Sequence, residues 1–354
     1  MSKQPRVPTT RARMRGAPFA VLALVLSIVL SACGGTSSST ASSDAPPNTG
    51  SASQGAFPVT IKHKYGSTTI EQQPKRVVTL GLSDQDAVLA LGIKPVGAVD
   101  WFKERPYGKW PWTNKKWGNE RPEIVGVRDK YDIEKIAALE PDVIIAQYSG
   151  MKKEQYQKLA KIAPVVAQPP DYPPYAAPWK VMSRRIGKAL GKSDEMNKLI
   201  TQVESRFAKV REQHPEWSKQ TMVVADSFEP GVYSAFLKTD PKAIFFNELG
   251  FKLPKKINEL GEKGKNVLKV GAERLGLFDQ DRLVWLTSSK KANKRIKSEP
   301  LYQQLGVVNQ GDAQFIPYKK PGYVGAAISF NTVLSIPYAV DKVVPMLTQQ
   351  SGKN

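Results

Sequence analysis

Histidine and cysteine are scarce in this chain, and their scarcity limits the chemistry it can carry. Its 354 residues include two histidines, His63 and His214, and a single cysteine, Cys33. No disulfide can form within the chain. Two separated histidines also supply neither a usual zinc site nor a histidine-based catalytic triad. We therefore expect no resident metal or cofactor, and no enzyme activity.

Nucleotide-binding and hydrolase motifs are also missing. The segment Gly187 to Ser193, GKALGKS, resembles a phosphate-binding loop, but it has three residues between its glycines where that loop needs four. There is no GxSxG motif. Two S-x-x-K matches, Ser149 to Lys152 and Ser288 to Lys291, have no SDN or KTG element beside them. These absences favour a binding protein over an enzyme.

The first residues have the pattern of a bacterial lipoprotein signal. A basic region is followed by an apolar run from Phe19 to Leu30, which is too short to span a membrane stably. The run ends in LSACG, a lipobox that places a lipid on Cys33. We predict a signal peptide over residues 1–32 and a flexible tether over 33–57, rich in Ser, Gly and Pro. A simple export signal with an incidental cysteine is the alternative.

Basic residues exceed acidic ones in the chain as a whole. The net charge is +20, and removal of residues 1–32, which hold five basic and no acidic residues, leaves +15. Such a charge favours anionic ligands and surfaces. However, the lysines are dispersed and no DNA-binding motif is present, so we expect no nucleic-acid partner.

The segment from Ser193 to Gln213 has the pattern of a long amphipathic helix. Ser193 is a suitable N-cap, acidic residues follow it, and Pro215 stands just past the end. Six apolar residues recur at spacings of three, four and seven: Met196, Leu199, Ile200, Val203, Phe207 and Val210. At 1.5 Å per residue the helix is roughly 32 Å long, enough to join two lobes.

A short pattern occurs on both sides of this helix. Residues 134–145, EKIAALEPDVII, and 273–284, ERLGLFDQDRLV, share their acidic and apolar positions. Each is typical of a short helix that leads into a buried parallel strand, and each half also opens on an apolar strand-like run. We predict two α/β lobes, an N-terminal lobe over 58–190 and a C-terminal lobe over 215–350, joined by a helix within 191–214. Trp285 is expected in the core.

The N-terminal lobe also carries a family resemblance. Residues 66–99, GSTTIEQQPKRVVTLGLSDQDAVLALGIKPVGAV, resemble the opening of substrate-binding lipoproteins of the ferric-siderophore and cobalamin class, which feed ABC importers. IEKIAALEPDVIIAQ and AAISFNTVLSIPYAVDKVVPML agree, so the similarity covers about residues 58–348. It is strongest for iron-siderophore members from Gram-positive bacteria. The resemblance implies a class III fold, in which two Rossmann-like lobes are bridged by a single long α-helix.

Loops that follow predicted strands supply the candidate ligand site. In open parallel sheets, ligands sit beyond the carboxyl ends of the strands. An aromatic loop, Asp100 to Glu120, begins at one such end, and its rings either line a ligand wall or only hold the loop to its own lobe. The candidate ligand-binding residues are Trp101, Phe102, Arg105, Tyr107, Trp112, Arg128, Gln147, Tyr148, Tyr233, Ser288 and Tyr323.

The resemblance gives Arg128 and Tyr148 a specific role. They match an arginine and a tyrosine that contact the iron-bound oxygens of hydroxamate siderophores in family members. A guanidinium and a phenol can donate hydrogen bonds to such oxygens without displacing the iron. The alternative for Arg128 is a surface salt bridge with Asp129 or Asp132.

The resemblance also implies one acidic residue on each lobe that meets arginines of the permease. Asp86 matches on the first lobe and Glu248 on the second, and ordinary solvated helix residues are the alternative for both. The expected protein is a monomer, anchored through Cys33 at the extracytoplasmic face of the membrane. It captures a ferric siderophore in a cleft and delivers it to the transmembrane subunits of an ABC permease.

Several alternatives stay open at this point. Within the binding class they are cobalamin, haem and ferric citrate, and Tyr148 could serve as a haem ligand. From another class, the rival is a membrane-anchored hydrolase that processes siderophores. The sequence does not distinguish hydroxamate, catecholate and carboxylate siderophores.

Overall fold

The computed structural model describes residues 56–103, 107–287 and 289–349. All of them belong to one compact unit, Gly50–Asn354. The predicted signal peptide, Cys33 and nearly all of the tether lie outside the described residues, as do Arg105 and Ser288. Within the described part of the chain, no helix combines the length and the apolar character needed to cross a bilayer.

The N-terminal lobe is built on a five-stranded parallel sheet with the strand order β5-β4-β3-β8-β9. Its strands are β3 (Val77–Thr79), β4 (Gly97–Ala98), β5 (Glu123–Ile124), β8 (Val143–Ile145) and β9 (Val165–Val166). Its helices are α1 (Asp84–Ala90), α2 (Asn114–Trp117), α3 (Ile133–Ala138), α4 (Lys153–Leu159) and α5 (Trp179–Ala189). An antiparallel hairpin precedes the sheet, formed by β1 (Val59–His63) and β2 (Gly66–Ile70).

A second, smaller hairpin follows the strand β5 at the edge of this sheet. The sheet strand β5 ends at Ile124, and the chain then forms β6 (Gly126–Val127) and β7 (Lys130–Tyr131). Arg128 and Asp129 are the two turn residues between these strands, and Arg128 has φ +52°. Arg128 therefore lies in a turn outside the five-stranded sheet.

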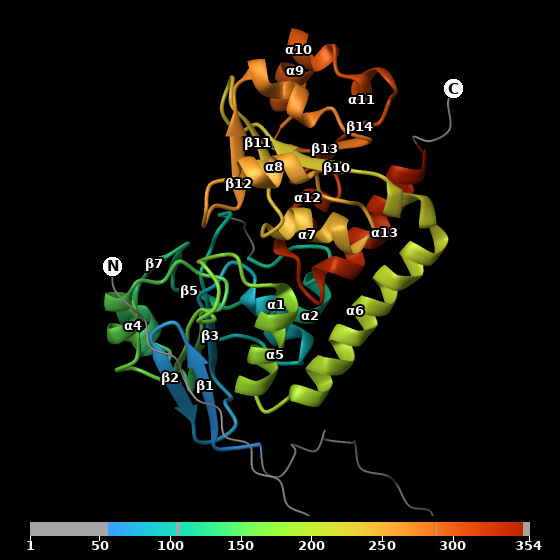
Figure 1. Cartoon of the computed structure of the whole chain (residues 1–354). Coiled ribbons are helices and arrows are strands. Elements are labelled where there is room, and N and C mark those ends of the chain that lie inside the picture. Colours follow the sequence, from blue (N-terminus) through green and yellow to red (C-terminus); the bar gives the residue numbers. More distant parts are fainter. Residues whose placement is uncertain (1–55, 104–106, 288, 350–354) are drawn as a thin grey trace, which may run out of the picture. The chain divides into compact units, whose positions relative to one another are not determined.

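The long helix α6 (Ser193–Gln213) connects the two lobes, as predicted. Figure 1 shows it beside both lobes, beginning next to α5 and ending next to the C-terminal lobe. Its buried face carries five of the six predicted apolar residues and packs on α5 and α13. The predicted N-cap is wrong by one residue: Lys192 occupies the cap position, and its Nζ lies 3.6 Å from Glu195 Oε1. A 3₁₀ helix, η1 (Pro215–Lys219), follows.

The C-terminal lobe has a five-stranded sheet with the order β12-β11-β10-β13-β14. Its strands are β10 (Met222–Asp226), β11 (Tyr233–Phe236), β12 (Val267–Val270), β13 (Arg282–Thr287) and β14 (Ala313–Pro317). Its helices are α7 (Pro241–Glu248), α8 (Lys255–Leu260), η2 (Ala272–Phe278), α9 (Lys290–Lys297), α10 (Pro300–Gln303), α11 (Gly306–Asn309), α12 (Val324–Phe330) and α13 (Ser335–Thr348).

This second sheet is mixed, which corrects the prediction of parallel sheets in both halves. Strands β10, β13 and β14 are parallel, but β11 and β12 run antiparallel to their neighbours. The cause is the connection after β10, residues 227–232, which is too short for the crossover that a parallel pair requires.

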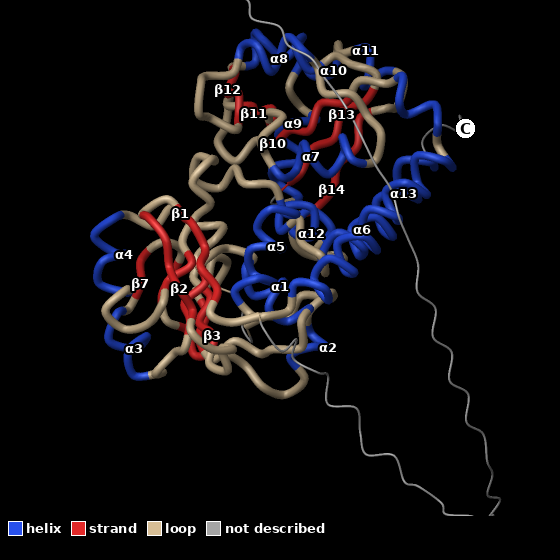
Figure 2. The backbone as a smooth tube through the Cα atoms, turned by 60° about the horizontal axis from the view of Figure 1, so that its bottom comes forward, coloured by secondary structure: helices blue, strands red, loops and turns tan. Residues whose placement is uncertain are grey.

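The internal repeat is present despite that difference. In the first lobe Val77 pairs with Val143, and in the second Met222 pairs with Arg282. In the first half β8 follows the short helix α3 and lies beside β3. In the second half β13 follows the short helix η2 and lies beside β10. Trp285 on β13 is fully buried, as expected for a core residue. Figure 2 shows the two sheets as separate layers, each with helices packed around it.

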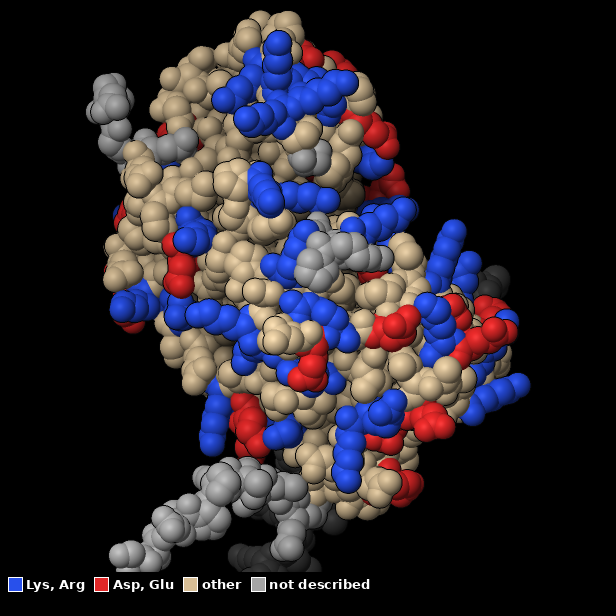
Figure 3. Space-filling model, turned by 180° about the vertical axis from the view of Figure 1, so that it is seen from behind, with Lys and Arg blue, Asp and Glu red and all other residues tan. Residues whose placement is uncertain are grey.

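Basic side chains are spread over the surface with one local concentration. Helix α9 contains five Lys or Arg among its eight residues. Figure 3 shows Lys and Arg side chains gathered at the end of the C-terminal lobe, where Figure 1 places α9 and α10. The lysines are therefore dispersed over most of the surface seen in Figure 3, as expected, but not at this end of the C-terminal lobe.

Candidate functional site

A cavity of about 570 Å³ lies between the two lobes. Its volume is within the range of small-molecule binding sites. The lining residues are Leu82, Trp101, Phe102, Trp110, Arg128, Asp129, Tyr148 and Tyr175 from the N-terminal lobe, and Phe228, Asp240, Lys242, Asn266, Tyr318, Lys319, Ala326 and Ser329 from the C-terminal lobe. A larger cavity of about 720 Å³ is confined to residues 221–259 and has no aromatic lining. The interlobe cavity is therefore the better candidate.

Tyr148 is held in this cavity by a buried carboxylate. Asp84, at the start of α1, accepts hydrogen bonds from the backbone N–H groups of Gln147 (2.7 Å) and Tyr148 (3.1 Å). Burial raises the pKa of Asp84 to about 6, although these backbone donors lower it. A Cβ on Gly81 would lie 2.2 Å from Asp84 Oδ2, so a larger residue there would displace this carboxylate. The chain after β8 is thus fixed, and the Tyr148 ring stands at the cavity wall.

Arg128 reaches the cavity from the turn between β6 and β7. Its guanidinium lies over the Trp101 ring, 5.5 Å from the ring centroid. The two predicted salt-bridge partners are engaged elsewhere. Asp129 accepts from Tyr131 and Gly150, and Asp132 caps α3. Among the described residues no ion pair involves Arg128, so its charge is available at the cavity.

The opposite wall carries a buried ion pair. Lys242 Nζ lies 2.8 Å from Asp240 Oδ1, and the Lys242 side chain also lies over the Phe236 ring at 4.1 Å. Asp240 caps α7 by accepting from the Lys242 N–H at 2.9 Å, and it accepts from Asn266 Nδ2 at 3.1 Å. Burial opposes the charge on Lys242, but Asp240 and the nearby phenols Tyr318 and Tyr148 hold its pKa above the usual value. Lys242 is therefore a protonated group at this wall.

The aromatic loop packs mainly across the lobe boundary. Trp110 contacts Phe330 and Tyr323 of the C-terminal lobe, with ring centroids 5.2 and 5.4 Å apart. Phe102 stacks on Phe330 at 5.7 Å while it also lines the cavity. Trp112 stacks on Trp110 at 5.4 Å. Phe102 and Trp110 therefore both line the cavity and pack against the other lobe, and most ring contacts of Phe102, Trp110 and Trp112 cross the lobe boundary.

Four of the predicted ligand residues line the interlobe cavity: Trp101, Phe102, Arg128 and Tyr148. Five others do not, which corrects their predicted placement. Gln147 is buried and donates to Val166 O and Ala167 O, and Tyr107 packs on Trp117. Tyr233 belongs to strand β11, where it is buried beside Trp285 and donates to Glu299. Trp112 and Tyr323 belong to the interlobe aromatic contacts.

Asp86 is not an exposed docking residue. Its side chain is fully buried, and its Oδ2 accepts from Trp112 Nε1 and from Thr332 Oγ1, both at 2.8 Å. Thr332 belongs to the C-terminal lobe, so this carboxylate connects the lobes. The sequence placed Asp86 correctly in a helix, but burial of that helix depends on the partner lobe and is not visible in local periodicity.

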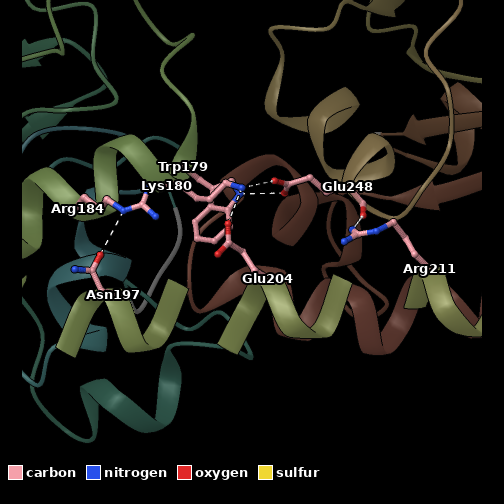
Figure 4. Close-up of polar contacts among 7 residues, drawn as sticks. All are labelled: Trp179, Lys180, Arg184, Asn197, Glu204, Arg211 and Glu248. Atoms are coloured by element: carbon pink, nitrogen blue, oxygen red, sulfur yellow. Dashed lines mark hydrogen bonds and ion pairs between the residues drawn. The ribbon is translucent and has the colours of Figure 1, made fainter. Parts of the chain in front are cut away.

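Glu248 has a similar position on the other side of the lobe boundary. Its carboxylate accepts from Trp179 Nε1 at 3.1 Å and lies 3.4 Å from Lys180 Nζ, and both partners are on α5 of the N-terminal lobe. Lys180 also pairs with Glu204 of α6 at 2.9 Å. Figure 4 shows these contacts gathered between α5, α6 and α7. The structure thus gives Glu248 interlobe partners, whereas a docking residue should face solvent.

A family model described as "Periplasmic binding protein" matches residues 77–317, which is more than half of the chain. This chain belongs to the periplasmic binding protein family. The match covers both five-stranded sheets and α6, and it ends just before the cavity-lining residues Tyr318, Lys319, Ala326 and Ser329.

Individual members of the periplasmic binding protein family are similar over most of their length. The probable siderophore-binding lipoprotein YfiY of Bacillus subtilis is 29% identical over 82% of this chain and 87% of its own. A solved periplasmic solute binding protein of Mycobacterium smegmatis has a TM-score of 0.72 at 30% identity, over 83% of this chain and 99% of that one. PiaA of Streptococcus pneumoniae in complex with ferrichrome has a TM-score of 0.70 at 27% identity, over 82% and 98%. These relatives are binding proteins.

Sequence reasoning missed most of the C-terminal wall of this periplasmic binding protein. Phe228 and Tyr318 follow strands β10 and β14, so the strand-end rule could have selected them. Asp240 and Lys242 could have been found as the cap and first turn of a helix that begins at Pro241. Tyr175 lies in a Pro-rich segment with no periodic signal. Within the described residues, no cluster of three or more His, Cys, Asp or Glu could hold a metal ion.

The interlobe carboxylate Asp86 predicts a pH-dependent stability. Burial raises its pKa to about 7 from 3.8, whereas its hydrogen bonds with Thr332, Trp112 and Gln85 lower it. A carboxyl whose pKa is higher in the folded state stabilises the protein below its unfolded pKa, and this stabilisation is lost as the pH rises through the folded pKa. The free energy of unfolding should therefore fall as the pH rises from about 4 to about 7.

Asp86→Asn should weaken this dependence, because the amide keeps an oxygen acceptor but cannot ionise. Urea unfolding at several pH values between about 5 and about 8 measures the effect. The variant should show a smaller loss of unfolding free energy across that interval, and exposed Asp194→Asn should behave like the unaltered protein. An unchanged pH dependence in Asp86→Asn would refute a protonation change at the lobe boundary.

Proposed function

We propose that this protein captures a ferric siderophore in the interlobe cavity and delivers it to an ABC permease. The observation that carries the proposal is the cavity itself, in which Arg128 and Tyr148 stand at a wall rich in aromatic rings. The family, the siderophore-binding name of one relative and the ferrichrome complex of another support it. Affinity comes from aromatic contact area and from charge-assisted hydrogen bonds to the chelate oxygens.

The location of the protein is part of the proposal. Lipid on Cys33 holds the mature chain at the extracytoplasmic face of the membrane, where it works as a monomer without a cofactor of its own. The relative YfiY is named a lipoprotein, which agrees with the lipobox of this chain. The ferric siderophore is cargo, and the chain transfers it unchanged to the transmembrane subunits.

Two observations on the cavity bear on the alternatives. Burial raises the pKa of Tyr148, which favours the phenol that donates hydrogen bonds over the phenolate that ligates haem iron. Among the described lining residues there is no histidine or cysteine, and Ser329 donates to the backbone oxygen of Gly325 at 2.8 Å. A nucleophile beside a base, as a siderophore hydrolase needs, is not assembled from these side chains.

Tryptophan fluorescence tests the proposal, because Trp101 and Trp110 line the cavity. The purified mature protein should show saturable quenching with at least one ferric siderophore from a panel of hydroxamates, catecholates and citrate, and weaker quenching with the iron-free form. Chromatography of the recovered ligand should show it unchanged. Saturation only by cobalamin or haem, or conversion of the siderophore to products, would contradict the proposal.

A further inference from the structure

The charged side chains of the interlobe cavity nearly balance one another. Of the described residues that line it, three are basic, Arg128, Lys242 and Lys319, and two are acidic, Asp129 and Asp240. Three positive charges less two negative charges leave a net charge of +1 at the cavity wall.

We infer that the cavity selects ferric chelates of low net charge, of the neutral tris-hydroxamate type, over polyanionic tris-catecholate or citrate chelates. The inference rests on the proposed function and adds the substrate class. Three hydroxamate anions neutralise one ferric ion, whereas three doubly charged catecholates leave a triply negative complex. The neutral tris-hydroxamate complex needs little counter-charge from the protein, whereas the triply negative tris-catecholate complex needs a strongly positive site.

The N-terminal carboxylate is built into the fold. Asp129 Oδ1 accepts from the Tyr131 hydroxyl at 3.0 Å and from the Gly150 N–H at 2.9 Å, and Oδ2 accepts from the Tyr175 hydroxyl. Burial and the Asp129 carboxylate raise the pKa of both Tyr131 and Tyr175, so both phenols stay protonated as donors. Asp129 cannot leave the cavity wall without the loss of these three bonds.

The C-terminal carboxylate is fixed in the same way. Asp240 has an exposed side-chain fraction of 3% and holds the first turn of α7, Lys242 Nζ and Asn266 together. It neutralises Lys242 where that lysine meets the cavity. An unpaired lysine at this position would increase the affinity for a polyanion, but Lys242 is paired with the Asp240 carboxylate.

Most of the uncharged lining residues are aromatic, and none of them adds a charge. Burial raises the pKa values of Tyr148, Tyr175 and Tyr318, so these phenols are neutral donors at physiological pH. Trp101, Trp110 and other rings complete the surface. Such a wall favours a chelate with apolar faces. A triply negative complex would instead lose its hydration without enough counter-charge, which is costly in a partly buried site.

Relative affinity for three probes tests the inference. The mature protein should bind a neutral ferric tris-hydroxamate at least about 100-fold more tightly than a ferric tris-catecholate or ferric citrate, by fluorescence titration at physiological salt. Equal or tighter binding of either polyanionic chelate would overturn the inference and leave the proposed function standing. Binding of none of the three, with cobalamin or haem bound instead, would refute the proposed function.

Removal of one negative charge should shift this selectivity. Asp240→Asn keeps an oxygen to cap α7 but leaves Lys242 uncompensated, and it should move the affinity ratio toward the polyanionic chelates about tenfold. Asp129→Asn makes the same change from the opposite lobe and serves if the first variant is unstable. Glu262→Gln removes an equal charge at an exposed position outside the cavity. If Glu262→Gln shifted the ratio as much, net charge rather than the cavity would be responsible.

Discussion

Joint replacement of Arg128 and Tyr148 by alanine should lower the affinity for the preferred ferric siderophore by at least about 100-fold. Each side chain lines the cavity, and hydrogen bonds from charged or buried donors contribute roughly 1 to 3 kcal/mol, about tenfold or more apiece. The Arg128 change also removes the cation that lies over Trp101. Titration of tryptophan fluorescence gives the dissociation constants.

Single variants separate the contributions of these two residues. Tyr148→Phe keeps the ring that packs edge to face on Tyr175 at 5.6 Å and removes only the hydroxyl, so it isolates the hydrogen bond. Lys130→Ala is a matched control, because it removes an exposed cation from the same hairpin without touching the cavity. If the double variant bound as well as Lys130→Ala, the site would lie elsewhere.

Replacement of Cys33 by alanine should abolish lipid attachment to the chain. The thiol of Cys33 is the only one in the sequence, so no other residue can receive a thioether-linked diacylglyceryl group. In the proposed function, two or three acyl chains, at about 0.8 kcal/mol per buried methylene, would keep the mature protein on the membrane. Incorporation of labelled fatty acid during expression in a bacterial host measures the modification.

The control for this experiment is a variant that changes a residue near Cys33 and keeps the thiol. Ser38→Ala lies just past the lipobox and should be labelled as strongly as the unaltered chain. Cys33→Ala should show only background label. Full labelling of Cys33→Ala would show that the lipid is attached elsewhere and would remove the basis for anchoring through this cysteine.

Features set by local sequence were predicted well. The spacing of the apolar face of α6 and the buried run of β8 both depend on neighbouring residues. The internal repeat was visible for the same reason, because each copy is a short helix followed by a strand. The family resemblance added the class III arrangement, in which these parts form two bridged lobes.

Features set by contacts between the lobes were not predictable. Asp86 and Glu248 stand in ordinary helical sequence, and only the opposite lobe makes them partners of Thr332 and Trp179. The aromatic loop was recognised as unusual, but three of its rings, Phe102, Trp110 and Trp112, pack on Phe330 of α12, far away in sequence. Lys242 was missed for another reason. It follows an antiparallel strand, whereas the strand-end rule applies to parallel sheets.

Asp86 and Glu248, the two predicted docking carboxylates, both have structural roles at the lobe boundary. Each accepts hydrogen bonds from the other lobe, and together with the aromatic contacts they hold the two cavity walls in one relative position. A cavity whose walls are held in this way is pre-organised for its ligand, which reduces the conformational cost of binding.

The position of the iron atom in a crystal of the complex tests the central claim most directly. Anomalous diffraction at the iron absorption edge, from crystals grown with the preferred ferric siderophore, locates that atom without reference to any other part of the structure. The account predicts a single iron peak in the interlobe cavity, with chelate oxygens facing Arg128 and Tyr148. An iron peak in the cavity of residues 221–259, or outside both cavities, would contradict it.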